Sequence, residues 1–562
     1  MTRLDSGALP RPTLFLGLLA ALLLVFPLRA LASAESVGSE IQQILKSGKH
    51  ARLRWGNFAD VSKSLSALYM PADAPLWTRD GVPTAQAKAI LEVLSLADDV
   101  GLNAADYDVG LLSEWIKSPA LRSAPHESAA FDVAMSVAVS RYAGNVALGR
   151  INPKSVGFAL DVEPRRPLVL KALRELPQAA NPKGLLASLE PDFPIYRPLK
   201  EALVRYRRLA VEIPKARFAF PAKFTPGMSH PDVPALRKLL TALGDFPASL
   251  GPGSDASQVY DPALVAAVKA FQIRHGIGDD GVIGKGTLSR LVVPVPDRLK
   301  QIQLGLERLR WLPANVKGLY LIVNIPAFKL YGARAGEGIG QHELQMNVVV
   351  GEAIDGRNTP VFHSEMTTVT FRPYWNVPEA IATKEIVPAL LKQASYLTKN
   401  NMEIVANFAQ SAQALEPSHD TIERLAAGAV KVRQKPGPEN ALGLYKFSFP
   451  NTNNVYLHST PSKGLFNRDR RDFSHGCIRV QDPLALAQWV LEENGDWGRE
   501  RIETFANGEV TKTINLKRAI PVYILYSTVM ADPQGRISFY EDIYGHDRTL
   551  QVLLARGFPY GS

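Results

Sequence analysis

The single cysteine of the chain, Cys477, lies in the octet FSHGCIRV, residues 473–480. A cysteine thiolate can attack a carbonyl carbon. It needs a base or cation nearby to lose its proton, and hydrogen-bond donors to stabilise the oxyanion that forms. Two of the ten histidines, His458 and His475, lie within 20 residues upstream. The pattern predicts covalent catalysis by Cys477, with a buried and inert thiol as the alternative.

The spacing around Cys477 indicates how the backbone can support this chemistry. His475 and Cys477 are two residues apart, so on an extended chain their side chains share one side. Gly476 between them permits an unusual turn, in which the amides of residues 475–477 can converge as an oxyanion hole. His458 ends a β-rich run, so a strand can present its ring. Arg479 adds a positive charge that favours the thiolate and attracts a carboxylate.

These residues do not form a convincing metal or nucleotide site. His458, His475 and Cys477 are potential zinc ligands, but no fourth ligand is evident and the surrounding sequence is basic. The stretch GEAIDG, residues 351–356, lacks the lysine and the spacing of a phosphate-binding loop. We therefore predict that the chain needs no metal and no cofactor.

Composition restricts the class of partner. The net charge of +10 and the isoelectric point of about 9.4 favour anionic partners such as nucleic acid, anionic lipid or an acidic wall polymer. No run of five basic residues occurs, and no zinc-finger spacing, so nucleic acid is not expected. One cysteine cannot form an intramolecular disulfide, so stability must come from packing.

The N-terminus has the pattern of a secretory signal peptide. Arg3 and Arg11 precede an apolar run at residues 13–28, and Ala32-Ser33-Ala34 is a small-residue cleavage site. The run is shorter than the roughly 20 residues that span a membrane. We expect residues 1–34 to be removed on export to the periplasm. Membrane association through an uncleaved segment is the alternative.

The remaining chain divides by its periodicity. Residues 35–224 carry helical patterns and predict a helical scaffold. Residues 225–293 predict three helices, the second capped by Asp261 with Pro262 in its first turn. Residues 294–317 are expected to be a linker. The length of 562 residues suits three to four domains.

From residue 318 to about 530 the pattern changes to β-rich runs punctuated by Gly, Pro and Asn, which predicts a mostly-β domain. A helical segment at about 381–440 interrupts it as an inserted lid, and residues 531–562 form a C-terminal extension. The predicted fold class is multidomain α+β.

Two stretches resemble known families. Residues 225–293, with VAAVKAFQ and DGVIGKGTLSRL, resemble the peptidoglycan-binding domain 1 family. His458-Ser-Thr followed by Ser474-His-Gly-Cys-Ile-Arg, with the histidine 19 residues before the cysteine, resembles the L,D-transpeptidase (YkuD-like) signature. This resemblance covers roughly residues 319–530 and includes a Gly351 turn and a Thr359-Pro360 pair. The whole layout resembles the long L,D-transpeptidases of Gram-negative bacteria.

The resemblance implies a role for each site residue. Cys477 is expected as the nucleophile and His458 as the general base and acid. The amides of His475, Gly476 and Cys477 are expected as the oxyanion hole, which places His475 and Gly476 in the catalytic set. The expected substrate-binding residues are Arg479, Ser459, Tyr456, Trp375 and Ser474.

The implied reaction is a transfer through a thioester. It releases D-Ala from a tetrapeptide donor and forms a 3→3 crosslink between peptidoglycan stem peptides. Within enzymes, the alternatives are an L,D-carboxypeptidase, a hydrolase that cleaves existing crosslinks, and attachment of an outer-membrane protein to the wall. A wall-binding protein without catalysis is a further alternative, although both histidines and Cys477 are intact.

Overall fold

The computed structural model describes residues 36–70, 74–213, 215–246, 256–313, 316, 318–335, 344–354, 356–532 and 534–560. The signal segment predicted at residues 1–34 lies outside this part of the chain. Two compact units are present, Met1–Arg150 with Val162–Pro191 and Arg556–Gly561, and Ile151–Asp161 with Asp192–Ala555. Helical units and a β-rich unit occur in one chain, so the predicted multidomain α+β class is confirmed.

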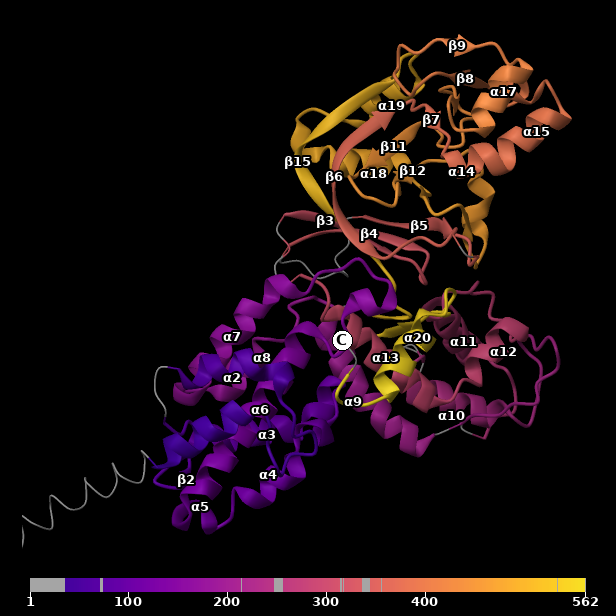
Figure 1. Ribbon diagram of the computed structural model, residues 1–562. Coiled ribbons are helices and arrows are strands. Elements are labelled where there is room, and N and C mark those ends of the chain that lie inside the picture. The colour runs from indigo at the N-terminus through magenta and orange to yellow at the C-terminus, as the bar shows by residue number, and fades with distance from the viewer. Residues whose placement is uncertain are drawn as a thin grey trace, which may run out of the picture. The chain divides into compact units, whose positions relative to one another are not determined.

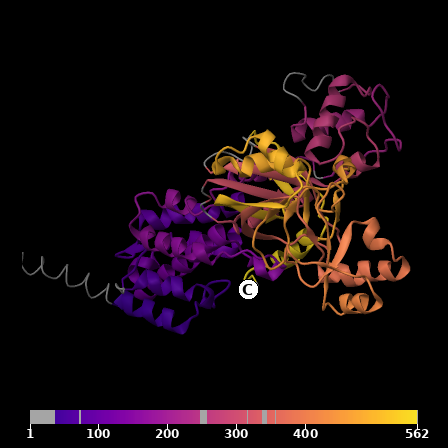
Figure 2. The same cartoon turned by 90° about the horizontal axis from the view of Figure 1, so that it is seen from above.

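The first unit is built from helices, drawn in indigo and purple in Figure 2. Its central helix α6 is buried on nearly all sides over its 24 residues because its sequence is apolar or small all round. Besides a helix over residues 36–47, the unit contains the helices α2 Ser62–Tyr69, α3 Ala85–Ser95, α4 Val109–Trp115, α5 Ala120–Ser123, α6 Pro125–Leu148, α7 Arg166–Glu175 and α8 Pro182–Ala187. A short hairpin pairs β1 Thr78–Arg79 with β2 Val82–Pro83.

A buried carboxyl group on α6 ties this helix to the segment before β1. The Asp132 oxygens accept hydrogen bonds from the amides of Leu76 and Trp77, at 2.8 and 2.7 Å. The Tyr69 hydroxyl donates to the same side chain at 2.8 Å. Burial raises the pKa of Asp132 to about 6 despite these donors.

Residues 225–293 contain three helices, as predicted: α10 Val233–Leu243, α11 Pro262–Arg274 and α12 Lys285–Leu291. The Asp261 side chain accepts a hydrogen bond from the amide of Leu264 at 2.9 Å and so caps α11, with Pro262 in the first turn. Phe224, Leu240, Val268 and other apolar residues form a separate small core.

The expectation of a linker at residues 294–317 is wrong in one respect. The stretch contains helix α13 Val295–Leu309, which packs on α9 Tyr196–Glu212. Ile302, Leu306 and Leu309 recur at helical spacing and are buried, which explains why the segment is a structural helix. Helix α9, expected in the scaffold, therefore belongs to the second unit.

Most of the predicted C-terminal extension, up to Ala555, is integrated into the second unit. Strand β16 Val529–Ala531 pairs with β17 Ile537–Phe539, and helix α20 His546–Ala555 follows. Arg308 of α13 and Asp547 of α20 form a buried ion pair. This segment packs on α13 and, through the Tyr544 hydroxyl, contacts Gly351 at the end of strand β5 Leu344–Gly351.

A nine-stranded sheet forms the centre of the second unit (Figure 1). Its order is β13-β5-β14-β12-β11-β6-β15-β3-β4, and β5 also pairs with β4, so the sheet curls back on itself. The strands are β3 Leu319–Asn324, β4 Lys329–Arg334, β5 Leu344–Gly351, β6 Phe362–Phe371, β11 Tyr445–Ser448, β12 Leu457–His458, β13 Asp472–Ser474, β14 Ile478–Val480 and β15 Lys512–Leu525. Helices α18 Pro483–Val490 and α19 Arg499–Asn507 follow the strand that carries Arg479.

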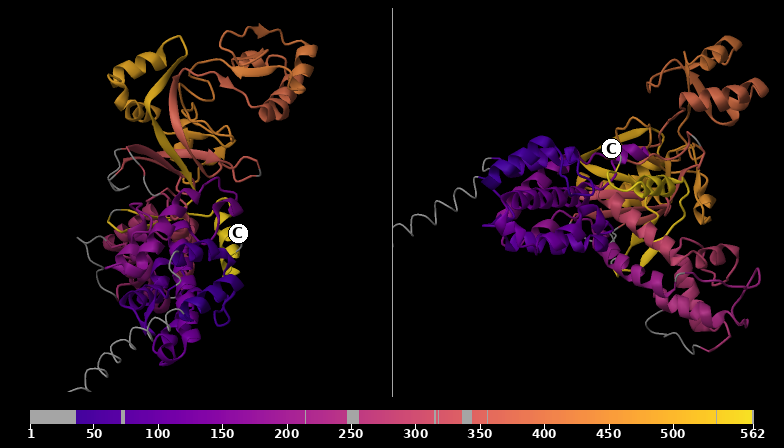
Figure 3. Two further views of the ribbon diagram at one scale, coloured as in Figure 1. Left: turned by 60° about the vertical axis from the view of Figure 1, so that its left-hand side comes forward. Right: turned by 60° about the horizontal axis from the view of Figure 1, so that its bottom comes forward.

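The insert between β6 and β11 differs from the predicted helical lid because it contains a sheet as well as helices. Coloured orange in Figure 3, it holds a four-stranded sheet in the order β7-β10-β8-β9. Its elements are β7 Trp375–Asn376, α14 Glu379–Ile381, α15 Val387–Lys392, α16 Tyr396–Lys399, β8 Met402–Val405, β9 Ala414–Leu415, α17 His419–Ala426 and β10 Lys431–Gln434. The insert has its own hydrophobic core and is therefore a small folded body. This core includes Ile386, Leu390, Ile404, Leu425 and Val432.

No helix in the described part of the chain has both the length and the hydropathy needed to cross a membrane.

The buried carboxyl of Asp132 predicts a pH-dependent stability difference. Because its pKa is raised in the fold, its contribution is present at low pH and lost as pH rises through about 6. The free energy of unfolding of the wild type relative to Asp132→Asn should therefore increase by up to about 3 kcal/mol as pH falls from 7 to 4. Urea unfolding at several pH values measures this difference. The exposed Asp80→Asn is the control, and a difference that stays flat or shrinks on acidification would contradict the assignment.

Candidate active site

Four side chains named from the sequence lie on one face of the sheet. Strand β12 runs parallel to β14, with Leu457 opposite Ile478 and His458 opposite Arg479. By the same register Tyr456 lies beside Cys477, and the Ile478 amide donates to the Tyr456 carbonyl at 3.1 Å. Directly opposed residues share a face, and so do residues two apart on a strand. Tyr456, His458, Cys477 and Arg479 are therefore neighbours on one face.

The turn before Cys477 is held by Ser474. The Ser474 hydroxyl donates to the Cys477 carbonyl at 2.5 Å and accepts from the Gly476 amide at 3.2 Å. Gly476 has a φ of +116°, a conformation that L side chains rarely adopt. Ser474, expected to bind substrate, is 2 % exposed and lies under the loop, so it shapes the turn instead.

The predicted convergence of three amides is only partly realised. The Gly476 amide points to Ser474, whereas the amides of His475 and Cys477 have no acceptor among the described residues. Two free amides flanking a nucleophile can still stabilise an oxyanion. Gly476 thus contributes through its backbone conformation, which shapes the turn that contains the His475 and Cys477 amides.

A second layer of hydrogen bonds fixes the carbonyl side of this turn. The Thr359 hydroxyl, 1 % exposed with its residue, donates to the Gly476 carbonyl and accepts from the Gly351 amide, both at 2.8 Å. Tyr544 donates to the Gly351 carbonyl at 2.5 Å. A Cβ on Gly351 would lie 2.0 Å from the Arg357 carbonyl oxygen, so only glycine fits there. The turn predicted at Gly351 with Thr359 therefore braces the nucleophile loop.

The ring of His458 is held in one tautomer. Its Nδ1 lies 2.6 Å from the carbonyl oxygen of Ser459, which can only accept, so the proton is on Nδ1 and Nε2 carries the lone pair. Burial and the charge of Arg479 lower the pKa of His458 to about 3. The imidazole is neutral at physiological pH and can accept a proton.

The environment of Cys477 balances burial against nearby donors and cations. Burial raises the pKa of the thiol, while Tyr456, Lys446 and Arg479 oppose that shift. In the resting state the thiol hydrogen points to the carbonyl of Asn454, with Sγ 3.7 Å from that oxygen. A protonated thiol beside a neutral imidazole is therefore the resting pair.

Ser459 does not face the site. It is 6 % exposed, and its hydroxyl donates to the Leu442 carbonyl at 3.0 Å and accepts from the Tyr445 amide at 3.1 Å. A Cβ on Gly443 would lie 2.1 Å from this hydroxyl oxygen, so the chain passes very close. The expectation that Ser459 binds substrate is not met. It fixes the backbone that offers a carbonyl to His458.

The side chain of His475 points to the insert. Its Nε2 lies 2.9 Å from Glu385, which also pairs with Arg357 at 3.3 Å. Arg357 in turn pairs with Glu352 at 2.9 Å, at the end of β5. These half-exposed groups join the nucleophile loop to the insert. The ring of His475 is thus engaged by the insert, and its amide has no acceptor among the described residues.

Trp375 and Tyr456, both expected in the substrate pocket, do meet. The Tyr456 hydroxyl interacts with Trp375 and with Cys477, and its ring centroid is 5.7 Å from that of His458. Trp375 comes from β7, the first strand of the insert, and pairs with Gln434 of β10. The insert thus supplies one wall beside the thiol.

Lys446 is a member of this site that the sequence analysis missed. It lies on β11 opposite His458, and its Nζ is 4.1 Å from the centroid of the Tyr456 ring. The signal available was the alternation of LYKFSF, in which Lys446 is the polar position on a strand adjoining the histidine strand. Thr359 was noted only as part of a turn.

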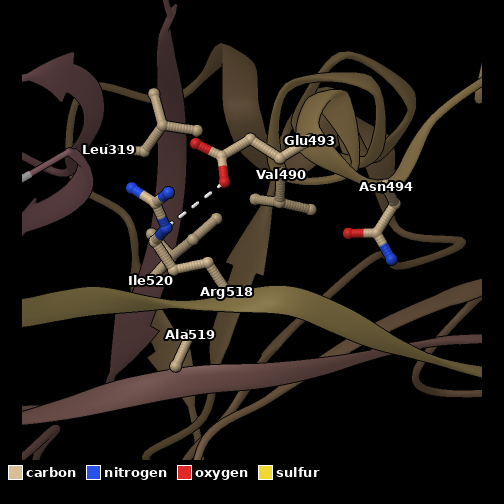
Figure 4. A pocket seen from close by; sticks show the side chains of 7 residues that line it. All are labelled: Leu319, Val490, Glu493, Asn494, Arg518, Ala519 and Ile520. Carbon is tan, nitrogen blue, oxygen red and sulfur yellow. Dashed lines mark ion pairs between the residues drawn. The ribbon is translucent and has the colours of Figure 1, made fainter.

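Neither the well-defined cavity at the far edge of the sheet nor a metal cluster competes with this site. That cavity, shown in Figure 4, lies beside the 3.4 Å ion pair between Arg518 and Glu493 and has a volume of about 10 Å³, room for one water at most. Across the described ranges, no group of three or more His, Cys, Asp or Glu side chains could hold a metal ion.

The resting thiol–imidazole pair predicts a distinctive pH profile. Alkylation of Cys477 by neutral iodoacetamide should be slow at pH 5–7 and rise with an inflection above the ordinary thiol pKa of about 8.5, because the pKa of Cys477 is raised. Mass spectrometry of the modified chain follows the rate. A fast plateau between pH 5 and 7 would show a thiolate–imidazolium pair and contradict the neutral state of His458.

Comparisons with known proteins agree with this geometry. The family model of the L,D-transpeptidase catalytic domain matches residues 318–524, that of the "Putative peptidoglycan binding domain" matches residues 229–291, and that of the scaffold domain matches residues 63–203. The first of these contains the whole sheet face with Cys477 and His458.

One curated relative and one solved structure are similar to parts of the chain. A protein of Haemophilus influenzae named "Putative L,D-transpeptidase" is 33 % identical over 253 residues, which is 45 % of this chain and 49 % of the relative. A crystal structure of the L,D-transpeptidase from Xylanimonas cellulosilytica covers 55 % of this chain and 100 % of its own, at 17 % identity and a TM-score of 0.17, too low for a comparison of folds. The chain thus carries an L,D-transpeptidase catalytic domain together with a scaffold domain and a domain of the peptidoglycan-binding type.

Proposed function

We propose that the protein is a peptidoglycan L,D-transpeptidase that forms 3→3 crosslinks through a thioester on Cys477. The observation that carries the proposal is the shared face of Cys477 and His458 inside the region that matches the catalytic-domain model. The neutral imidazole, with its lone pair on Nε2, supports a role as general base. The domain at residues 229–291 supports a wall polymer as the substrate.

In the first half of the reaction Cys477 takes the acyl group. His458 Nε2 accepts the thiol proton as Sγ attacks the carbonyl carbon between the third residue of the donor and its terminal D-Ala. The amides of His475 and Cys477 stabilise the oxyanion. His458 then returns the proton to the departing amine, so D-Ala leaves neutral at nitrogen and the thioester remains.

In the second half an amine of another stem peptide attacks the thioester. His458 removes one proton from that amine and delivers it to the sulfur as the C–S bond breaks. The bond energy of the original peptide bond is kept through both steps. No nucleotide is consumed, which is consistent with the periplasmic location that we propose for the exported chain.

The balance between transfer and hydrolysis depends on access of water to the thioester. We propose that the insert restricts this access, because Trp375 lies beside Tyr456 and Glu385 pairs with His475. If water or a protein amine is the acceptor, the same residues give an L,D-carboxypeptidase, a crosslink-cleaving hydrolase, or attachment of an outer-membrane protein. These are the competing outcomes of the test below.

The proposal predicts the products made from disaccharide-tetrapeptides. The purified protein should yield a crosslinked dimer with loss of D-Ala, detected by mass spectrometry, and Cys477→Ala should yield none. His458→Ala should slow acylation by roughly a hundred- to ten-thousandfold. Tripeptide without dimer would indicate a carboxypeptidase. The absence of any Cys477-dependent product would refute both activities.

The brace under the loop gives a second prediction, with a matched pair of variants. Thr359→Val removes the hydroxyl that joins Gly351 to Gly476 at nearly constant volume, whereas Thr359→Ser keeps it. Acylation should fall about tenfold or more in the valine variant, because the loop amides lose their position, and stay near wild type in the serine variant. Equal rates for both variants would show that this hydroxyl does not position the loop.

A further inference from the structure

Lys446 is a partly buried cation, and no carboxylate of the described residues forms an ion pair with it. Its position on β11 opposite His458 points its side chain toward the same face as Cys477. Among the described residues it forms no ion pair and no hydrogen bond, and its Nζ lies over the ring of Tyr456 at 4.1 Å. Burial lowers the pKa of its ammonium, and the proximity of Cys477 opposes that shift.

Lys446 destabilises the fold unless an anion binds to its ammonium group. A desolvated ammonium without a compensating charge destabilises a fold, so buried cations are normally paired. A cation–π contact with Tyr456 recovers only part of that cost. The thiol is protonated at rest and carries no charge for Lys446 to balance. The compensating anion must therefore come from outside the described part of the chain.

A second cation lies on the other side of His458 and two residues after the thiol. Arg479, opposite His458 on β14, likewise forms no hydrogen bond or ion pair within the described ranges, and its buried Nε has no partner. Besides Cys477, whose thiol is neutral at rest, the opposing charge that acts on Arg479 is Glu352, which is already paired with Arg357. His458 thus lies between two cations, Lys446 on β11 and Arg479 on β14, and the face that also carries Cys477 has an excess of positive charge.

We propose that Lys446 is the receptor for a carboxylate group of the donor stem peptide, an inference that rests on the function proposed above. Such peptides carry a carboxylate at the terminal D-Ala and another on the side chain of the diamino acid. Either one, brought to the face that holds Cys477, would supply the missing anion. An ammonium gives a strong charge-assisted hydrogen bond to such a group.

Binding of a substrate carboxylate by Lys446 can be distinguished by experiment from a purely electrostatic effect of Lys446 on the site. A residue that only tunes Cys477 or His458 would affect every substrate equally. A carboxylate receptor affects only those substrates that carry the group it binds. The difference between acid and amide substrates therefore reports on the contact itself.

The experiment crosses three donors with four proteins. The donors are the disaccharide-tetrapeptide, its terminal carboxamide and its diamino-acid side-chain carboxamide. The proteins are wild type, Lys446→Met, Lys446→Arg and Lys512→Met, the last an exposed lysine of β15 in the same sheet. Acylation kcat/KM is measured for each pair, and thermal unfolding establishes that each variant is folded.

In the wild type, one carboxamide should lower kcat/KM by roughly ten- to hundredfold relative to the acid. In Lys446→Met, kcat/KM for the acid donor should fall to the value for that carboxamide, so that the preference for the acid disappears. Lys446→Arg should keep most of this preference. Lys512→Met should keep all of it. The carboxamide that shows the effect identifies whether the terminal or the side-chain carboxylate is bound.

A uniform fall on all three donors in Lys446→Met, or an unchanged preference, would overturn the inference while leaving the transpeptidase proposal intact. If Lys446→Met does not fold, Lys446→Gln replaces it, and the same two results apply. If the wild type acts on none of the donors, the proposed function fails and the inference fails with it.

Discussion

The parallel pairing of β12 with β14 is the constraint on which the site depends. Only a few residues pair, yet they put His458 beside Arg479 and Tyr456 beside Cys477. Residues 19 apart in sequence thereby become neighbours on one face, although the chain between them contains the short 3-10 helix Lys463–Asn467 and strand β13. The neighbouring strands β5 and β11 hold this pair on both sides, so the geometry is set by the sheet as a whole.

Around that pair, the protein uses backbone groups where other sites use side chains. The Ser459 carbonyl selects the tautomer of His458, and the His475 and Cys477 amides are left for the reacting oxygen. Ser459, Ser474 and Thr359 are all buried hydroxyls that hold backbone segments in place. Few side chains therefore lie next to Cys477 and His458. The positions of these two residues depend largely on the buried hydroxyls beneath them.

The sequence was most informative where residue type and chain order carry the chemistry. Cys477, His458 and Arg479 could be named from their types and spacing, and Tyr456 and Trp375 from the family resemblance. The structure brings all five together. Ser459 and Ser474 were misjudged because a hydroxyl reads the same whether it faces a ligand or a carbonyl. The Gly476 amide could not be assigned either, since its direction depends on one dihedral angle. Lys446 was missed because its importance depends on which strands pair. Helix α13 was missed because a single helix between two domains resembles a linker in the sequence.

Tyr544 extends the site to a late part of the chain. Its hydroxyl binds the Gly351 carbonyl, and Gly351 is joined through Thr359 to the turn that carries the nucleophile. A nascent chain that has not yet reached residue 544 cannot have the full set of bonds around this loop. During synthesis, Cys477 is therefore made before the residues that complete its surroundings. The surroundings of Cys477 would stay incomplete until this last segment had folded onto the sheet.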